Sequence, residues 1–233
     1  MMDVISLYDY TGEMLRPWAR FSKVNCYAYD IQHVGQSKRH GINYVHADLH
    51  DENTLEDIVC RHYGSAAIIF GFPVCTDLAV SGARHFANKA AADPLFQERA
   101  AQHAINVSLV AKALNVPYMV ENPVSRLATL WRKPDHTFDP FEYGGYLSDS
   151  EAEHPRWPEY IAPRDAYSKR TCLWTGNGFI MPDERPVECE AYGRSRQWGK
   201  LGGKSAKTKN IRSATPRGFA KAVACANLPL LWT

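Results

Sequence analysis

Residues 68–86, IIFGFPVCTDLAVSGARHF, begin as a run of apolar residues and end as a polar loop. The apolar run is typical of a strand buried inside a sheet, and it runs into Pro73. Cys75 follows directly after the Phe-Pro-Val step, at the start of the loop. A thiol on a loop above a sheet is accessible, whereas most structural cysteines are buried and inert. Cys75 is therefore a candidate nucleophile, with a small packing residue as the alternative.

The pattern of a short apolar strand followed by a polar connection recurs on both sides of this stretch. We predict strands at residues 4–7, 24–30, 42–48, 65–72, 116–123 and 171–176. One helix is predicted to begin near Met14, and another begins with Asp93 as its cap and Pro94 in the first helical position. Strands that alternate with helical connections predict an α/β fold with a mostly parallel, doubly wound sheet.

The composition is that of an ordinary globular protein. With 233 residues, of which 45% are hydrophobic and 22% charged, the chain fits one α/β domain with a sizeable core. The six cysteines are scattered without a C-x-x-C pair, and there is neither a signal peptide nor a membrane-spanning run. We therefore expect free thiols in a reducing cytoplasm. His46 and His50 are four residues apart, but without a neighbouring cysteine pair they predict no metal site.

Charge is unevenly distributed, although the formal net charge is only +2. Lysines and arginines without any acidic residue occupy the segment 193–221, whereas residues 139–159 are rich in aspartate and glutamate. The basic segment suggests a polyanionic partner, with a solvated tail as the alternative. Two stretches read as irregular: 133–167 is rich in Pro, Gly and aromatic residues, and 186–212 is rich in Gly, Lys and Ser.

Three aspartates end the first three predicted strands, at the edge where open α/β sheets bind ligands. Asp9 is followed by Thr11-Gly12, a turn in which glycine lets the backbone approach a ligand closely. Asp30 stands where an acidic side chain commonly accepts from ribose hydroxyls, and Asp48 is suitably placed for an adenine amino group. Because no G-x-G-x-x-G turn is present, the set predicts an adenosine pocket without a diphosphate, which S-adenosylmethionine fits. Any one of these aspartates alone could be a turn former.

Glu121 ends the fifth predicted strand, in the sequence VENP at residues 120–123. The carboxyl ends of parallel strands meet at one edge of a sheet, so Glu121 is expected to share that edge with Cys75. A nucleophile and an acid on neighbouring strand ends suit covalent catalysis with proton assistance. A helix-capping glutamate is the alternative.

Taken in order, these motifs resemble those of the DNA cytosine-5 methyltransferase family, in the compact form common in bacteriophage genomes. The resemblance rests on LYDYTGE (7–13), Cys75 with Ser81-Gly82, ENP (121–123), KRTCLW (169–174) and RSATPRGFAKAVA (212–224). It implies a Rossmann-like, class I S-adenosylmethionine-dependent methyltransferase fold with a reduced target-recognition region. It also implies a catalytic domain at 1–180 with an irregular insertion at 133–167, a small basic target-recognition loop or subdomain at 181–211, and a C-terminal helix at 212–233 that returns to the catalytic domain.

The resemblance assigns roles to individual residues. Cys75 would add as a thiolate to C6 of a cytosine flipped out of the duplex. Glu121 would hold N3 and the exocyclic amine, and Arg170 would hold the base oxygen, while S-adenosylmethionine supplies the methyl group for C5. The expected activity is that of a DNA (cytosine-5-)-methyltransferase.

Two larger residue sets follow from the same resemblance. The expected cofactor-binding residues are Asp9, Tyr10, Thr11, Gly12, Glu13, Asp30, Ile31, Asp48, Leu49, Phe72, Ser213 and Thr215. The expected DNA-binding residues are Ser81, Gly82, Arg84, Arg194, Arg196, Lys200, Lys204, Lys207 and Lys209. Double-stranded DNA is the expected partner, with no membrane, no metal and no obligate protein partner. A monomer or weak dimer is expected, in the host cytoplasm if a phage encodes the chain.

The chain departs from the family pattern at several positions. Val74 stands where the family usually places proline, Ser168 replaces the usual companion of Arg170, and 213–215 read Ser-Ala-Thr where many members have Asn-Ser-Val. Only residues 171–211 separate Arg170 from the last motif, so we expect a short target context. Two alternatives stay open: a methyltransferase that acts on cytosine in transfer RNA, and a catalytically inactive DNA-binding relative.

Overall fold

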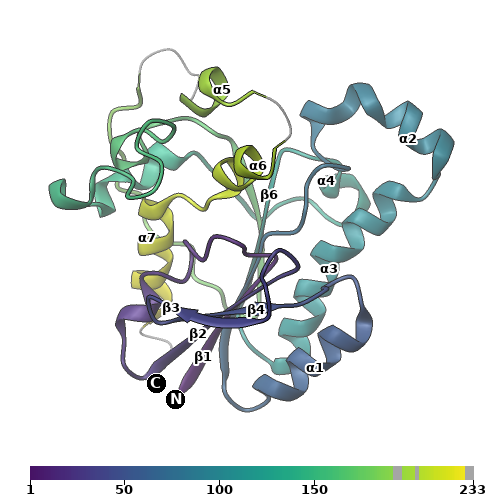
Figure 1. Ribbon diagram of the computed structural model, residues 1–233, viewed down its shortest axis with the longest axis horizontal. Helices are drawn as coiled ribbons and strands as arrows, with labels where there is room; N and C mark the ends of the chain where they lie inside the picture. The colour runs from purple at the N-terminus through teal and green to yellow at the C-terminus, as the bar shows by residue number, and fades with distance from the viewer. Residues whose placement is uncertain (191–195, 203–204, 229–233) are drawn as a thin grey trace.

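The computed structural model describes residues 1–190, 196–202 and 205–228. Within these residues the strands form one eight-stranded sheet in the order β3-β4-β2-β1-β5-β6-β8-β7 (Figure 1). Five adjacent strands run parallel: β4 (Ile42–His46), β2 (Val24–Asp30), β1 (Met2–Leu7), β5 (Ala66–Gly71) and β6 (Tyr118–Pro123). Three strands run antiparallel to a neighbour: β3 (Gln36–Arg39), β8 (Thr171–Gly176) and β7 (His136–Phe138).

The α/β class predicted from the strand pattern is confirmed, and the sheet is mixed rather than uniformly parallel. At one edge, β3 returns as β4 through a two-residue loop, with φ 51° at His40 and φ 79° at Gly41. Two successive residues with positive φ suit the tight turn of an antiparallel hairpin. At the other edge β8 pairs antiparallel with both β6 and β7.

Helices cover both faces of the sheet (Figure 1). On one face α1 (Glu52–His62) and α3 (Phe96–Leu114) bury a core that includes Ile5 and Ile69. On the other face α7 (Arg217–Asn227) and the 3₁₀ helix η1 (Trp18–Arg20) bury a core that includes Val4 and Ile68. Successive residues of a strand point to opposite faces, so each central strand contributes to both cores.

The remaining helices are short and lie in the connections. They are the 3₁₀ helices η2 (Val80–His85), η3 (Pro140–Tyr146), η4 (Asp149–Glu151) and η5 (Pro163–Asp165), and the α-helices α2 (Phe86–Ala92), α4 (Leu127–Leu130), α5 (Arg196–Lys200) and α6 (Ala206–Ser213). Among the described helices, none combines the length and the apolar character needed to cross a bilayer. The insertion at 133–167 thus contains β7 and three 3₁₀ helices, η3, η4 and η5.

Two helix predictions were wrong in their details. No α-helix begins near Met14: the chain makes turns there and then the three-residue η1, because Pro17 disfavours helical conformation at the residue before it. The helix assigned to Asp93 begins at Phe96 instead. The Asp93 carboxylate accepts a hydrogen bond from the Leu95 amide at 3.1 Å, so it caps the turn that precedes the helix.

Candidate active site

The connections from β1 and β5 leave the sheet at its topological switch point. From β1 the chain builds toward β2 and β4, and from β5 it builds toward β6 on the opposite side. In open α/β sheets such a point forms the ligand-binding crevice beyond the carboxyl ends of the strands. The two exits are joined directly, because the Phe72 amide donates a hydrogen bond to the Leu7 carbonyl at 3.0 Å.

Cys75 lies in a tight turn just beyond β5. Its carbonyl oxygen accepts hydrogen bonds from the amides of Leu78 (3.0 Å) and Ala79 (2.8 Å). The Asn122 side chain, on β6, donates to the Pro73 carbonyl at 3.2 Å. Cys75 is half-buried, whereas its neighbour Val74 is 57% exposed. The thiol is therefore held on a fixed turn at the mouth of the sheet.

The segment after this turn is tied to the chain that leaves β6. Ala79 and Ser125 form an isolated antiparallel bridge. The Val80 amide donates to the Val124 carbonyl at 3.2 Å, and the Arg126 amide donates to the Leu78 carbonyl at 2.9 Å. These contacts fix the loop after Cys75 against the strand that carries Glu121.

Cys75 and Glu121 influence each other electrostatically. Burial raises the pKa of the Cys75 thiol, the Glu121 charge raises it further, and Lys169 lowers it. Burial also raises the pKa of the Glu121 carboxyl, which Lys169 again lowers. The thiol, the carboxyl and the ammonium group thus form one electrostatically linked cluster, in which the raised pKa of Cys75 favours the neutral thiol and Lys169 opposes that effect.

Lys169, which the sequence analysis did not single out, is the cation of this cluster. Its ammonium group also donates a hydrogen bond to the Arg212 carbonyl at 2.9 Å, at the end of α6. Arg170 lies elsewhere: its guanidinium pairs with Asp139 at 3.2 Å and contacts the Thr137 hydroxyl at 3.4 Å, and its side chain is 55% exposed. Lys169 and Arg170 are adjacent in KRTCLW, so the motif alone does not tell which of them faces Glu121.

The turn after β1 is built around Asp9. This buried carboxylate accepts hydrogen bonds from the Ser6 hydroxyl (2.8 Å), the Gly12 amide (2.7 Å) and the Thr11 hydroxyl (3.2 Å). Gly12 has φ 68°, and a Cβ there would lie 2.5 Å from the Tyr44 hydroxyl, so only glycine fits. Asp9 therefore shapes the turn rather than presenting a free carboxylate.

Glu13 completes this turn and is fully buried. Its carboxylate pairs with Arg16 at 3.1 Å and with Arg156, which also donates to the Thr11 carbonyl at 3.1 Å. Sequence reasoning missed Arg156, which reaches the turn from the insertion at 133–167. No local pattern links positions so far apart in the chain.

The other expected cofactor residues fall into two groups. Around β2, the buried Asp30 accepts from the Gln32 amide at 2.7 Å, Ile31 is exposed, and the exposed Tyr10 stacks on His33 with ring centroids 5.6 Å apart. Beyond these lie the remaining members, namely the exposed Asp48, the buried Leu49, the half-buried Phe72, the exposed Ser213 and the buried Thr215. The structure thus places apolar and acidic side chains along the ends of β1, β2 and β4.

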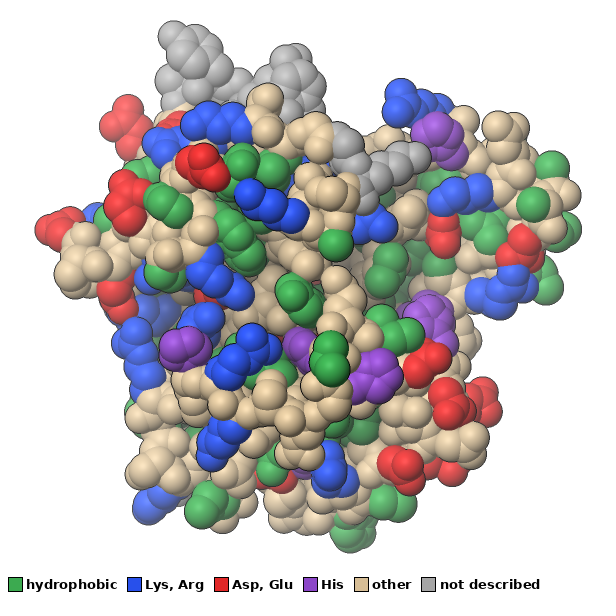
Figure 2. All heavy atoms as spheres, viewed as in Figure 1, with side chains coloured by type: hydrophobic (Ala, Val, Ile, Leu, Met, Phe, Trp, Pro, Cys, Tyr) green, Lys and Arg blue, Asp and Glu red, His purple; other side chains and the backbone are tan. Residues whose placement is uncertain are grey.

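The expected DNA-binding residues are dispersed. Ser81, Gly82 and Arg84 lie in η2, directly after the Cys75 turn. Arg196 pairs with Glu190 at 2.5 Å, Lys200 donates to the Glu159 carbonyl at 2.9 Å, and Lys207 lies over the Tyr160 ring. Lys209 is exposed on α6, while Arg194 and Lys204 lie outside the described residues. Figure 2 shows lysine and arginine side chains interspersed with acidic ones on the face it presents.

Comparison with known proteins gives limited information. No family model matches the chain, and no curated protein matches it. One matching solved structure, from Escherichia coli, is of a protein proposed to be a DNA modification methyltransferase encoded within a prophage. The TM-score is 0.42 and the sequence identity 12%, and the match covers 76% of this chain but only 46% of the other. A likeness at this level does not assign a function to this chain.

Proposed function

We propose that this chain is a DNA cytosine-5 methyltransferase that uses S-adenosylmethionine. The observation that carries the proposal is the attachment of the Cys75 turn to β6, the strand that carries Glu121, through the Asn122–Pro73 hydrogen bond and the Ala79–Ser125 bridge. Lys169 acts electrostatically on both groups. The order of the sequence motifs supports the same activity independently of the geometry. A sheet whose central strands run in the order β4-β2-β1-β5-β6 suits a Rossmann-like methyltransferase fold, with its ligand at the switch point between β1 and β5.

The turn after β1 and the end of β2 suit S-adenosylmethionine, an adenosine that carries a sulfonium group. Asp30 lies at the end of β2, where a carboxylate can accept from ribose hydroxyls. Tyr10 and Ile31 offer exposed apolar surface near the ends of β1 and β2 for a base. The left-handed backbone at Gly12 keeps the turn close to Tyr44 of β4. When bound there, S-adenosylmethionine would supply an electrophilic methyl group.

The residues of the cluster then have defined tasks. The Cys75 thiol must lose its proton, and the Lys169 ammonium favours the resulting thiolate. Addition of sulfur to C6 forms a C–S bond and moves the C5–C6 π electrons into a C4–C5 double bond, while the C4–N3 π electrons move onto N3, which takes the Glu121 proton. A raised Glu121 pKa keeps that proton available nearer to neutral pH. When C5 takes the methyl group, the C4–N3 double bond forms again and N3 returns its proton to Glu121. Loss of the C5 proton to a solvent base then restores the C5–C6 double bond and expels the Cys75 thiolate.

Methyl transfer to nucleic acid tests this proposal. The protein is incubated with labelled S-adenosylmethionine and either duplex DNA or transfer RNA, and the digested nucleosides are identified by mass. We expect label in 5-methylcytosine from DNA, lost in Cys75→Ala but retained in Cys60→Ala, which removes an exposed thiol of α1.

Other outcomes of this assay contradict parts of the proposal. Label in transfer RNA alone would replace the substrate and keep the chemistry. DNA binding without any transfer would identify a non-catalytic relative and make Val74, in place of the usual proline, the first position to restore. DNA that contains 5-fluorocytosine provides a second readout, because the lost C5 proton is replaced by fluorine and the adduct with Cys75 should persist.

A further inference from the structure

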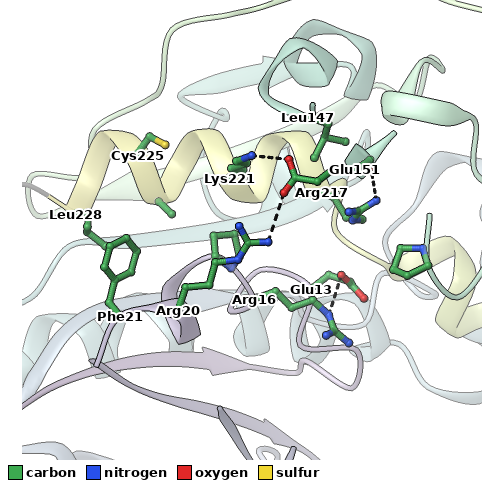
Figure 3. A pocket seen from close by; sticks show the side chains of 13 residues that line it. Glu13, Arg16, Arg20, Phe21, Leu147, Glu151, Arg217, Lys221, Cys225 and Leu228 are labelled. Carbon is green, nitrogen blue, oxygen red and sulfur yellow. Dashed lines mark hydrogen bonds and ion pairs between the residues drawn. The ribbon is translucent and has the colours of Figure 1, made fainter. Parts of the chain in front are cut away.

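A separate cavity opens between η1 and α7, on the face of the sheet opposite α1 and α3 (Figure 3). Its volume is about 600 Å³, which is within the range of sites that hold small molecules. None of Cys75, Glu121 and Lys169 lines it. Glu13, an expected cofactor-binding residue, does line it, but its carboxylate is already paired with Arg16 and Arg156. The reacting groups of the proposed methyl transfer thus lie outside this cavity.

Much of the cavity wall is apolar. Phe21 and Leu228 face one another at one end, and Leu147 projects from the opposite wall (Figure 3). Pro17, in the turn before η1, and Ala224, on α7, add aliphatic surface. Such a wall favours a ring or a short hydrocarbon chain over a fully polar ligand.

The charged residues of the wall leave a positive surplus. Among the described residues of the wall, the cations are Arg16, Arg20, Arg217 and Lys221, against the two carboxylates of Glu13 and Glu151. Glu151 is bonded to Lys221 at 2.7 Å and to Arg20 at 3.4 Å, and the hydrogen bond from Lys221 lowers the pKa of its carboxyl to about 2. Both carboxylates thus already have cationic partners within the protein.

Arg217 differs from the other cations in its contacts. One of its terminal nitrogens donates to the backbone carbonyls of Glu151 (2.9 Å) and Glu153 (3.0 Å). These bonds orient the guanidinium beside the cavity, and its carboxylate neighbour, Asp165, lies buried on the protein side rather than in the cavity wall. An oriented guanidinium is well suited to bind an oxyanion through its remaining donors.

We propose that this cavity binds a small amphipathic anion: an apolar ring or chain that carries one sulfonate, carboxylate or phosphate group. The apolar part lies against Phe21, Leu147 and Leu228, and the anionic group lies at the rim formed by Arg20, Arg217 and Lys221. This binding does not require methyl transfer, so the two proposals stand or fall separately.

The fluorescent probe 8-anilinonaphthalene-1-sulfonate tests this inference on the intact protein. We expect saturable binding at one site, measured by fluorescence titration. Cys225 lines the cavity and is exposed, so bound probe should slow its alkylation by iodoacetamide severalfold. Cys60, exposed on α1, is an internal control whose alkylation rate should not change. Equal protection of both cysteines, or of neither, would overturn the proposal.

Variants and an uncharged analogue separate the two parts of the site. Cys225→Trp fills the cavity and should abolish binding, whereas Cys60→Trp should not. Arg20→Gln combined with Lys221→Gln should raise the Kd about fivefold or more, as loss of two partly exposed charges predicts. N-phenyl-1-naphthylamine lacks the sulfonate and should bind more weakly. Equal affinity for the neutral analogue would refute an anion site here, and so would binding of 8-anilinonaphthalene-1-sulfonate that survives Cys225→Trp. Thermal unfolding that is unchanged from the wild type shows that each variant is folded.

Discussion

At the residue scale, the state of the Cys75 thiol depends on the balance between two charged neighbours. Glu121 raises the pKa of Cys75 and Lys169 lowers it, on top of the larger rise caused by burial. Lys169 also lowers the pKa of Glu121. A single ammonium group therefore counteracts burial at both sites: it makes the thiol more readily ionised and makes the carboxyl lose its proton at lower pH.

Lys169→Gln should make Cys75 less reactive at neutral pH. Removal of the cation raises the pKa of the thiol, so less thiolate is present at any pH below that pKa. Below its pKa, each unit of rise lowers the thiolate fraction tenfold, and we expect Cys75 alkylation at pH 7.5 to slow by about two- to tenfold. The measurement is the rate of iodoacetamide labelling of the Cys75 peptide between pH 6 and 10, with the midpoint displaced to higher pH.

The adjacent arginine supplies the matched control for this experiment. Arg170 pairs with the buried Asp139 and does not act on the Cys75 thiol, so Arg170→Gln should leave the midpoint of the labelling curve in place. If Arg170→Gln displaced the midpoint and Lys169→Gln did not, the assignment of the cation would be reversed. The same pair of variants, assayed for methyl transfer, separates a role at the thiol from a role in holding the base.

Individual residues also show which parts of the candidate site the sequence motifs could predict and which they could not. Cys75 and Glu121 could be identified because each follows a readable apolar strand, and the ends of such strands meet. Lys169 could not, because it precedes its strand and its direction depends on how the insertion returns to the sheet. Arg156 was missed for the same reason, since it reaches the Asp9 turn from a segment with no regular pattern.

At the scale of elements, the contact between β5 and α3 holds the strand that leads to Cys75. Gly71 ends β5, and a Cβ there would lie 2.5 Å and 2.7 Å from the two γ-carbons of Val107 on α3. Val107 is fully buried. The helix therefore lies closer to the strand than any side chain at position 71 would allow. This contact holds the end of β5, from which the chain enters the Cys75 turn.

Gly71→Ala should destabilise the protein, and Val107→Ala should partly rescue it. The added methyl group overpacks the interface, at about 1–3 kcal/mol of unfolding free energy. Val107→Ala alone leaves a cavity and costs about 1–2 kcal/mol. In the double variant only the Val107 Cβ remains close, at 3.1 Å, so the two costs should sum to less than their separate values. Urea unfolding of the wild type, the two single variants and the double variant measures these free energies. Strictly additive costs would show that α3 moves away from β5 when the methyl group is added.

The elements that sequence reasoning recovered are those with strong burial patterns. The five parallel strands and α3 bury continuous apolar residues, so their positions could be read to within a few residues. By contrast, β3 is exposed at every position and β7 has only three residues, so neither carries a strand signal. The helix prediction near Met14 was wrong for a different reason. The buried Met14 and Leu15 suggest a helix there, but Pro17 prevents it.

At the scale of the whole molecule, the acidic and basic parts of the sequence meet one another. Lys221 pairs with Glu151, and Arg217 donates to backbone carbonyls of the same insertion. Lys200 donates to the Glu159 carbonyl. Part of the basic segment is thus used to hold the insertion at 133–167 in place, which lowers the number of cations free for a polyanion. Charge counted along the sequence could not show this pairing, since it depends on how α7 packs.

The pH dependence of stability follows from a buried histidine in this same insertion. The His154 Nδ1 accepts hydrogen bonds from the amides of Arg156 (3.2 Å) and Trp157 (3.1 Å). Burial lowers the pKa of His154 to about 4, with Arg217 and Arg156 also lowering it and Glu13 opposing them. Protonation would remove the acceptor of both hydrogen bonds, so the folded protein keeps this ring neutral.

A lowered histidine pKa makes the protein lose stability as the pH falls. The unfolded chain takes up the proton near pH 6.5 and the folded chain only near pH 4, so stability contributed by His154 is complete above 6.5 and is lost between these values. A shift of this size corresponds to roughly 3 kcal/mol. Asp165, whose pKa burial raises to about 6, acts in the opposite direction, so the net slope of the wild type does not isolate the histidine.

The variant His154→Asn isolates the contribution of the histidine to the pH dependence of stability, because the amide oxygen of asparagine can accept a hydrogen bond but does not titrate. The variant should be less stable at pH 7.5, where it loses the packing of the ring on Trp157. Between pH 6.5 and 4 it should lose less stability than the wild type, by up to about 3 kcal/mol. The measurement is urea unfolding at a series of pH values, with His40→Asn in the exposed β3–β4 loop as the control. Parallel pH curves for His154→Asn and the wild type would mean that the pKa of His154 is the same in the folded and the unfolded chain, so that burial and its two hydrogen bonds do not keep the ring neutral.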